Sequence, residues 1–277
     1  MNQIPIMLNG LPGNVATIIA RHFAGSDRFH LMPYSLTGPE ITAAHTEVAG
    51  RKVSLIRPSE RDARLPEIAA AAGQSLIVVD FTHPSAVNDN AAFYCRNGLS
   101  FVMGTTGGDR QALVKTVTAS PVAAVIAPNM AKPIVGLQAM FEYAAEQFPG
   151  LFSGYRMTVI ESHQQGKADT SGTAKAVVHS FNRLGVDFPL DAIHKERDPQ
   201  IQRRDWGIPE AYLGGHGWHT YSLTSADDTV TLAFTHNING REVYAHGTLD
   251  AAAFLAARVA EGAAGRVYSM IDVLRGR

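Results

Sequence analysis

The sequence predicts an α/β protein with two domains, a doubly wound parallel sheet and a second α+β domain with a mixed sheet. Residues 1–131 alternate short apolar runs with segments of helical spacing, which is typical of a parallel sheet with crossover helices. The runs 76–79 and 122–126 are apolar without period-two alternation, as expected for strands buried on both faces. After Pro133 the pattern changes to a long helix and then to alternating runs.

The elements of the first half follow from apolar runs and turn residues. A strand over residues 4–8 runs into the turn 9–13 and a helix over 15–23. Further strands are predicted over residues 29–34, 53–56, 75–81, 100–103 and 122–126, with helices over 62–72 and 86–97.

The second half is predicted to be a mixed sheet with helices on one side. Residues 134–147 have helical spacing, residues 155–161 and 229–235 have strand patterns, and a helix is predicted over 173–184. The Ala-rich segments 249–258 and 267–274 are predicted to be helical. Spacing alone leaves open whether they cover the second domain or return to the first.

The composition excludes several kinds of partner. Lys and Arg total 24 and Asp and Glu 25, so overall charge does not favour nucleic acid or a membrane surface as a partner.

A single cysteine, Cys95, excludes an internal disulfide and fits a reducing compartment, so we expect a cytoplasmic protein. The apolar run starts so soon after Met1 that we expect no signal or transit peptide. No apolar stretch approaches the roughly 20 residues of a membrane helix.

The first strand-to-helix turn has the spacing of a nucleotide-binding loop. In Gly10-x-x-Gly13-x-x-Ala16, small residues allow close approach of a pyrophosphate to a helix N-terminus. The alternative is a plain tight turn. Residues 34–38, just past the second strand, contain neither an acidic nor a basic side chain to select NADH or NADPH, and the hydroxyls of Ser35 and Thr37 are the candidate ribose contacts.

Two more polar turns follow predicted strands at the same edge of the sheet. Residues 80–84 are Asp-Phe-Thr-His-Pro, and residues 104–108 are Gly-Thr-Thr-Gly-Gly. Ligands bind at the carboxyl ends of such strands, and the second loop suits the wall of a nicotinamide site. Asp80 has an alternative role as a helix cap.

Residues 161–174 combine three groups suited to reduction of an anionic substrate. Ser171 is the expected N-cap of the next helix, so the N–H groups of Gly172 and Thr173 are candidates for binding a carboxylate. Lys167 adds a positive charge, and His163 is the natural proton donor near neutral pH. The alternative is a solvated loop before a capped helix.

The remaining candidates are less specific. Four histidines, His216, His219, His236 and His246, have no recognisable metal-ligand spacing, so we expect no metal. Arg241 follows Asn239-Gly240 at an expected turn between two strands. It is a candidate substrate contact, or else a solvated hairpin arginine.

The segment 161–174 resembles the signature of the dihydrodipicolinate reductase family. The resemblance extends through Asp80-Phe81-Thr82-His83-Pro84, Gly104-Thr105-Thr106-Gly107, Ala127-Pro128-Asn129-Met130, Gly215-His216 and Asp272-Val273-Leu274. Gln164 and Thr170, where bacterial members have histidine and proline, resemble the plant-type branch.

This resemblance implies a Rossmann-type cofactor domain over residues 1–131 and 247–277 and a substrate and oligomerisation domain over 132–246. It implies reduction of a small cyclic imine dicarboxylate with NADPH or NADH in lysine biosynthesis, with domain closure and a homodimer or homotetramer. His163 would supply the proton, Lys167 would hold the substrate, and Ser171, Gly172, Thr173 and Arg241 would contact it. The implied nucleotide contacts are Gly10, Leu11, Gly13, Asn14, Val15, Ser35, Thr37, Phe81, Thr82, Gly104, Thr105, Thr106, Pro128, Asn129 and Met130.

One departure from the family keeps two other hypotheses open. The family has a basic residue, Met and Gly where this chain has Asn14, Val15 and Ala16, so a positive charge beside the pyrophosphate is missing. The alternatives are a reductase of a related cyclic imine acid and a non-catalytic nucleotide-binding scaffold with the same fold.

Overall fold

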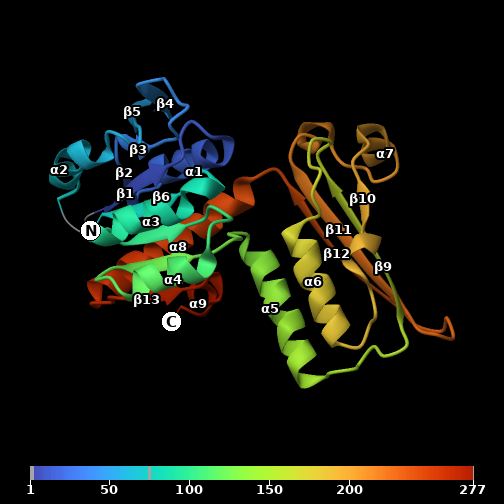
Figure 1. The fold of residues 1–277 in the computed structure, drawn as a ribbon. Helices are drawn as coiled ribbons and strands as arrows, with labels where there is room; N and C mark the ends of the chain where they lie inside the picture. Colours follow the sequence, from blue (N-terminus) through green and yellow to red (C-terminus); the bar gives the residue numbers. More distant parts are fainter. Residues whose placement is uncertain (1–2, 74–75, 277) are drawn as a thin grey trace. The chain divides into compact units, whose positions relative to one another are not determined.

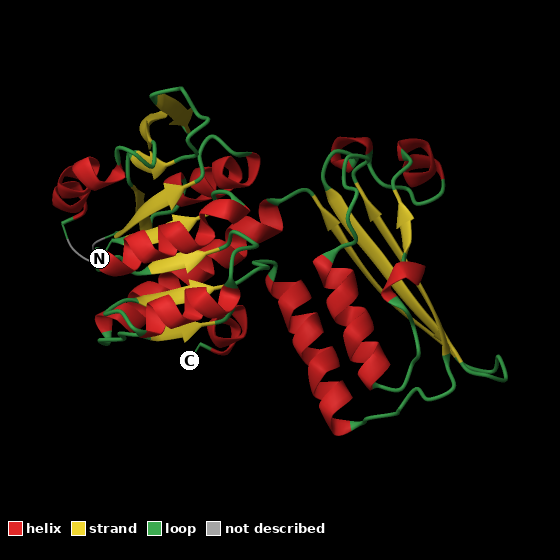
Figure 2. Ribbon diagram, in the orientation of Figure 1, coloured by secondary structure: helices red, strands yellow, loops and turns green. Residues whose placement is uncertain are grey.

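The chain forms two compact units in a computed structural model that describes residues 3–73 and 76–276 (Figures 1 and 2). Unit 1 comprises Met1–Lys132 and Glu242–Arg277, and unit 2 comprises Pro133–Arg241. Unit 1 is therefore built from two separate stretches of sequence. The predicted strand start at Ser75 lies outside the described residues.

Unit 1 is organised around a six-stranded parallel sheet, so the predicted doubly wound fold is confirmed. The strand order is β13-β8-β7-β6-β1-β2, and every neighbouring pair is parallel. The strands are β1 (Ile4–Asn9), β2 (Phe29–Leu31), β6 (Ile77–Asp80), β7 (Phe101–Met103), β8 (Ala123–Ile126) and β13 (Arg266–Tyr268).

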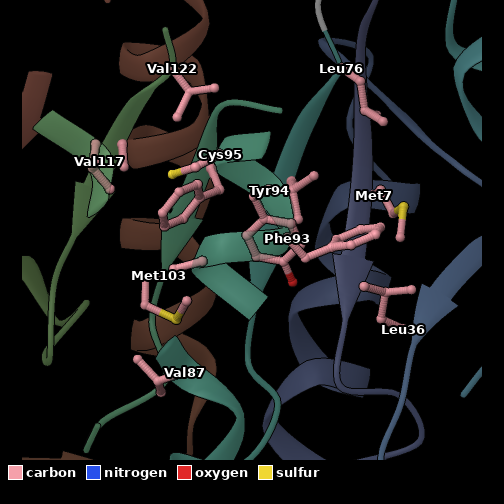
Figure 3. Packing of buried hydrophobic residues seen from close by; sticks show 14 of the residues in the cluster. Met7, Leu36, Leu76, Val87, Phe93, Tyr94, Cys95, Met103, Val117 and Val122 are labelled. Carbon is pink, nitrogen blue, oxygen red and sulfur yellow. The ribbon is translucent and has the colours of Figure 1, made fainter. Parts of the chain in front are cut away.

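Helices cover both faces of this sheet. On one face α1 (Asn14–Ala24) packs against α8 (Glu242–Ala260), which contacts β6, β7 and β8. On the other face lie α2 (Arg61–Ala72), α3 (Val87–Arg96) and α4 (Arg110–Thr118), and the short helices η1 (Pro84–Ala86) and α9 (Met270–Arg275) complete the unit. Figure 3 shows the core of the second face, where Tyr94 and Cys95 of α3 pack with Met103 and Val117. Burial of this apolar surface is the main stabilising contribution.

Two predictions in unit 1 were wrong in detail. Residues 29–34 do not form one strand, because Pro33 has no N–H to continue the ladder with β1. After Pro33 the chain enters a separate three-stranded sheet with order β3-β5-β4, formed by β3 (Tyr34–Leu36), β5 (Arg51–Ile56) and β4 (His45–Val48).

The segment 267–274 is not one helix either. The Gly265 N–H donates to the Val122 carbonyl over 2.9 Å, which places β13 beside β8. Ser269 then starts α9 through a capping box with Asp272.

Unit 2 is a mixed sheet with two long helices on one face, as predicted (Figure 2). The order is β10-β9-β11-β12, with β10 parallel to β9 and β11 antiparallel to β9 and β12. The elements are α5 (Lys132–Gln147), β9 (Arg156–His163), α6 (Gly172–Arg183), η2 (Leu190–Ala192), β10 (His194–Glu196), α7 (Pro199–Arg204), η3 (Glu210–Tyr212), β11 (His216–Thr224) and β12 (Thr231–Asn239).

The helix-covered face of this sheet changes from apolar to polar along its strands. Met157 and Val159 of β9 pack under α5 and α6, and the next two residues on the same face are Glu161 and His163. The cross-strand partner of Glu161 on β11 is His219, and that of His219 on β12 is His236. Strand pairing thus gathers titratable groups at one end of a hydrophobic layer.

Candidate active site

The turn after β1 has glycines because other groups occupy the space of a side chain. Gly10 has φ of +107°, and a Cβ there would lie 2.2 Å from the Phe81 carbonyl oxygen. At Gly13 a Cβ would lie 2.8 Å from the Gly10 carbonyl oxygen. Gly13 is the N-cap of α1 and offers no capping side chain, so the first N–H groups of that helix face outward. This backbone suits an approaching phosphate.

Beside this turn lies a cavity of about 610 Å³ within unit 1. It is bounded by the segments that follow β1, β3 and β6, at the carboxyl edge of the strands. Its lining contains six of the residues predicted to bind a nucleotide, Gly10, Leu11, Gly13, Thr37, Phe81 and Thr82. The lining described also includes Glu40 and contains no lysine or arginine.

Other predicted nucleotide contacts lie in different surroundings. Ser35 is fully buried, and its hydroxyl accepts from the Leu11 N–H and donates to the Leu36 carbonyl. Pro128 lines a separate cavity of about 370 Å³ together with Arg110. The side chain of Asn129 accepts from the Ala131 N–H. Contact of these residues with a nucleotide stays a prediction.

The remaining residues of that set fall into three groups. Asn14 and the exposed Thr106 lie at the surface, and Val15 is half-buried in the first turn of α1. Thr105 and Met130 are buried. Gly104 supports the ring of Phe81, because a Cβ at Gly104 would lie 2.2 Å from the Phe81 Cζ.

Asp80, at the end of β6, is a buried hydrogen-bond centre and not the cap of the following helix. Its Oδ1 accepts from the N–H and hydroxyl of Thr82 and from the Thr105 hydroxyl, at 2.7 to 3.0 Å. Its Oδ2 accepts from Asn90 and from the Tyr94 hydroxyl, at 3.0 and 2.6 Å. One carboxylate thereby fixes the loops that follow β6 and β7. His83 occupies the cap position instead.

His163 ends β9, and both of its ring nitrogens are hydrogen-bonded. Nδ1 lies 2.9 Å from the His216 carbonyl oxygen, and Nε2 lies 3.0 Å from Nε2 of His219. The side-chain amide of Gln202 donates to the His163 carbonyl over 2.7 Å. Gly217 lies opposite His163 in the β-ladder, where a Cβ would come within 3.1 Å of the imidazole. The ring is thus held from several sides.

The loop after β9 is fastened by Arg197, a residue that no local motif indicated. Its guanidinium donates to the Lys167 carbonyl at 2.7 Å and to the fully buried Glu161 carboxylate at 2.5 Å. Glu161 Oε2 in turn accepts from the Ser171 N–H at 2.9 Å. The ion pair connects β9, the loop and the start of α6, so Lys167 and the helix N-terminus are presented together.

The predicted substrate-binding groups lie around this loop. Ser171 is the N-cap of α6, as its sequence position indicates, but its hydroxyl makes no capping bond. Gly172 is the first residue of α6, so the first N–H groups of this helix are directed at the loop. The Lys167 ammonium is 2.7 Å from Asp169 Oδ1. Arg241 lies against Gly215, just before β11. It connects β12 to α8, so the predicted strand after it was wrong.

Burial dominates the electrostatics of this cluster. Burial lowers the pKa of His163 to about 4. The nearby Glu161 carboxylate acts to raise this pKa, and the positive charges of Arg197 and Lys167 lower it further. Burial likewise lowers the pKa of His219 to about 2, reinforced by His236 and His163. Both imidazoles are therefore neutral in the free protein at physiological pH.

Glu161, His163 and His219 place three ligand atoms within 4.8 Å of one another. The positive guanidinium of Arg197 is already bound to Glu161, and the remaining oxygen accepts from Ser171. A second cation at this carboxylate would be repelled by that guanidinium. We therefore interpret the cluster as a hydrogen-bonded group. Three of the four histidines singled out in the sequence lie in unit 2, while His246 lies in unit 1 beside His22.

Comparison with known proteins agrees with the two units. The family model "Dihydrodipicolinate reductase, N-terminus" matches residues 4–130, and "Dihydrodipicolinate reductase, C-terminus" matches residues 134–274. The chain belongs to the dihydrodipicolinate reductase family. The expectation of a pyridine-nucleotide-dependent reductase from this family is thereby confirmed.

Relatives of this reductase family include two plant proteins and one solved bacterial structure. The chain is 48% identical to the "Probable 4-hydroxy-tetrahydrodipicolinate reductase 1, chloroplastic" of Oryza sativa subsp. japonica, over 99% of this chain and 79% of that one. It is 46% identical to the "4-hydroxy-tetrahydrodipicolinate reductase 2, chloroplastic" of Arabidopsis thaliana, over 99% and 78%. The dipicolinate-bound dihydrodipicolinate reductase of Paenisporosarcina sp. TG-14 shares the fold, with a TM-score of 0.66, 16% identity and coverage of 97% and 98%.

These relatives correct one prediction and support another. The expected cytoplasmic location is contradicted, because the plant relatives are named chloroplastic. Cysteine content and charge report redox conditions and solubility, which do not identify a compartment. The higher identity to plant than to bacterial reductases, such as 29% for Anaeromyxobacter sp., agrees with the plant-type branch. Among the described helices, none has the length and apolar character to cross a membrane.

Proposed function

We propose that the protein reduces 4-hydroxy-tetrahydrodipicolinate with NAD(P)H, in the diaminopimelate route to lysine. In this reaction the substrate, NAD(P)H and one proton give tetrahydrodipicolinate, NAD(P)⁺ and water. The observation that carries the proposal is the joint presentation of His163, Lys167 and the N-terminus of α6 by one loop of unit 2. An imidazole, an ammonium and free N–H donors suit a doubly negative ring.

The substrate carboxylates would bind to cationic and N–H groups of unit 2. The N–H groups of Gly172 and Thr173 and the helix dipole would hold one carboxylate. Lys167, now paired with the exposed Asp169, would exchange that partner for the substrate. Arg241 and the hydroxyl of Ser171 are further candidate contacts. Because α6 is packed into the hydrophobic core, its start is a rigid platform.

His163 would deliver the proton that matches the hydride. The neutral imidazole of the free protein must first be protonated, and the negative charge of the bound dicarboxylate favours that step. NAD(P)H, when bound, supplies the hydride. Residues that fit its pyrophosphate and nicotinamide line the 610 Å³ cavity of unit 1, notably Gly10, Gly13, Phe81 and Thr82.

Replacement of His163 tests the mechanism. His163→Ala should lower kcat by roughly 10² to 10⁴ while leaving nucleotide affinity nearly unchanged. Turnover would be followed as loss of NAD(P)H absorbance with substrate generated in situ by dihydrodipicolinate synthase. The control is His179→Ala, on the exposed side of α6. Full activity of His163→Ala would exclude this mechanism, and an inactive wild-type protein would exclude the proposed substrate.

We propose NADH as the preferred nucleotide. The described cavity lining carries the carboxylate of Glu40 and no lysine or arginine, which disfavours the 2′-phosphate of NADPH. Glu40→Gln should lower KM for NADPH several-fold more than KM for NADH, because a repulsive charge is removed. Glu47→Gln, an exposed charge on β4, is the matched control. A wild-type preference for NADPH would contradict the proposal.

We also propose that the protein is a homo-oligomer assembled through the sheet of unit 2. On the face of this sheet opposite the helices, Trp218 of β11 lines a cavity of about 340 Å³ together with Trp206 from the segment after α7, and both side chains are half-buried. Aromatic residues that are partly accessible at the surface are enriched at protein interfaces. Light scattering coupled to gel filtration would report the mass, and a monomer at micromolar concentration would refute assembly.

A further inference from the structure

A chain of hydrogen bonds leads from His163 into the core of unit 2. The Tyr221 hydroxyl lies 2.9 Å from Nδ1 of His219, and Nε2 of His219 lies 3.0 Å from Nε2 of His163. Tyr221 is fully buried and His219 is 2% exposed, so neither side chain has water as an alternative partner. All three residues project from adjacent strands β9 and β11 onto the helix-covered face.

The groups at the two ends of this hydrogen-bond chain determine which ring nitrogens carry hydrogen. A carbonyl oxygen can only accept, so Nδ1 of His163 carries the hydrogen that it donates to His216. In neutral His163, Nε2 is therefore an acceptor, and His219 must donate to it from its own Nε2. Nδ1 of His219 then accepts from Tyr221. Among the described residues this hydroxyl has no second hydrogen-bond acceptor, and leaving its hydrogen unpaired in the core would be costly.

We infer that Tyr221 and His219 are positioning residues that hold Nε2 of His163 as an acceptor and so oppose formation of its imidazolium. The inference rests on the proposed role of His163 as proton donor. If His163 were protonated in place, two N–H groups would face each other across 3.0 Å. The alternative, in which His219 moves its hydrogen to Nδ1, would leave the Tyr221 hydroxyl without an acceptor.

This arrangement has a consequence for proton transfer. Protonation of Nε2 breaks its hydrogen bond with His219, so the imidazolium formed with the bound dianion is a donor that can give this proton to the substrate. In the proton transfer, a π bond of the hydride-reduced ring supplies the electron pair of the new C–H bond, while the N–H bond breaks and its electron pair stays on Nε2. That lone pair then accepts from His219 again. The chain thus stabilises His163 after it has given up its proton, which makes the imidazolium a stronger acid.

Other charged and titratable groups around the chain act in mixed directions. Glu161 favours the imidazolium of His163, while Arg197 and Lys167 oppose it. The ring of His236 lies 4.5 Å from that of His219, centre to centre, and His216 contributes its carbonyl to His163. Burial lowers the pKa of His163, so it opposes the imidazolium as the hydrogen-bond chain does. Removing the Tyr221 hydroxyl therefore changes the hydrogen-bond chain and leaves these charges in place.

The test measures the protonation of His163 directly. Protein with ¹⁵N-labelled histidine would be compared at about pH 5 and pH 7.5, on either side of the usual histidine range. Tyr221→Phe frees His219 to change tautomer, so more His163 imidazolium is expected at the lower pH than in the wild type. In the assay above, kcat should fall roughly tenfold while KM for the substrate stays within about twofold.

Two further variants and a control keep the test decisive. His219→Phe removes the donor and should act like Tyr221→Phe, and it serves if the tyrosine variant does not fold. His219→Gln, whose amide both donates and accepts, should retain more activity than His219→Phe. Tyr155→Phe removes a phenol elsewhere in unit 2 and should behave as the wild type. Unchanged His163 nitrogen shifts and kcat in folded Tyr221→Phe and His219→Phe would overturn the inference. An inactive wild type would refute the proposed function. The nitrogen shifts would still show whether Tyr221 and His219 control the protonation of His163.

Discussion

At the scale of single residues, the candidate site depends on the absence of a side chain at Gly217. This residue lies opposite His163 in the β9–β11 ladder and has an ordinary strand conformation, so backbone freedom is not the reason for a glycine. A methyl group there would lie 3.1 Å from Cε1 of the imidazole. The missing side chain provides the space in which the His163 ring makes its two hydrogen bonds.

Gly217→Ala should therefore displace the His163 ring without unfolding the sheet. A shift of a few tenths of an ångström would lengthen the hydrogen bonds to His216 and His219, and kcat should fall about tenfold. Steady-state kinetics and nucleotide titration would separate catalysis from cofactor binding. Gly214→Ala is the control, because a Cβ at that position meets nothing within 4 Å. Equal kcat for the two variants would show that the ring tolerates the methyl group.

Asp80 connects several loops, and its charge is needed because every partner donates to it. In Asp80→Asn, an amide nitrogen would face donors such as Tyr94 or Thr105. We expect unit 1 to lose about 2–3 kcal/mol of stability, since hydrogen bonds to a buried charged group are lost. Hydrogen exchange of amides in β6 and β7 would measure this loss. Asp109→Asn is the control, because Asp109 caps α4 at the surface and asparagine caps equally well. Equal exchange rates in the two variants would contradict the expectation.

At the scale of elements, the row of imidazoles across β9, β11 and β12 makes unit 2 sensitive to acid. The pKa of His219 is about 2 in the folded chain and near 6.5 when unfolded. Below pH 6.5 the unfolded chain binds a proton that the folded chain excludes, so stability present above that pH is lost as pH falls. His163, His216 and His236 are shifted in the same direction by burial.

The stability of unit 2 should accordingly fall between about pH 7 and pH 5. His219 alone should account for about 2 kcal/mol at pH 5. Both tryptophans of the chain, Trp206 and Trp218, lie in unit 2, so denaturant unfolding followed by their fluorescence reports on this unit. In His219→Phe the dependence on pH should be weaker by that amount. A wild-type midpoint that does not move with pH would refute this account.

The sequence predicted those parts of the site whose residues are close along the chain. Gly10 and Gly13 share one turn, and His163, Lys167 and Ser171 share one loop, so local spacing was informative. Arg197, His219 and Tyr221 reach the site because β10 and β11 pair with β9, and a single sequence does not reveal that register. The period-two pattern of His219 and Tyr221, which places both on one face of β11, was the available signal. The break at Pro33 could have been predicted from the missing N–H.

At the scale of the whole molecule, the two units divide the chemistry. Unit 1 contains a cavity whose lining includes small and apolar residues and the carboxylate of Glu40, and unit 2 contains the cluster of His163, Lys167 and Arg197. Each unit has its own hydrophobic cluster. The family models end and begin between residues 130 and 134, beside the boundary at Lys132. Variants in one unit should thus leave the stability of the other largely unchanged.

The split of unit 1 into two stretches has a consequence for synthesis. The 109 residues from Pro133 to Arg241 leave the ribosome before α8 and β13 do. At about 5–20 residues per second, the apolar surface of β6, β7 and β8 that α8 covers stays open for about 5 to 20 seconds. A nascent chain in that state is a natural client for a holding chaperone, whereas unit 2 can complete its own sheet without delay.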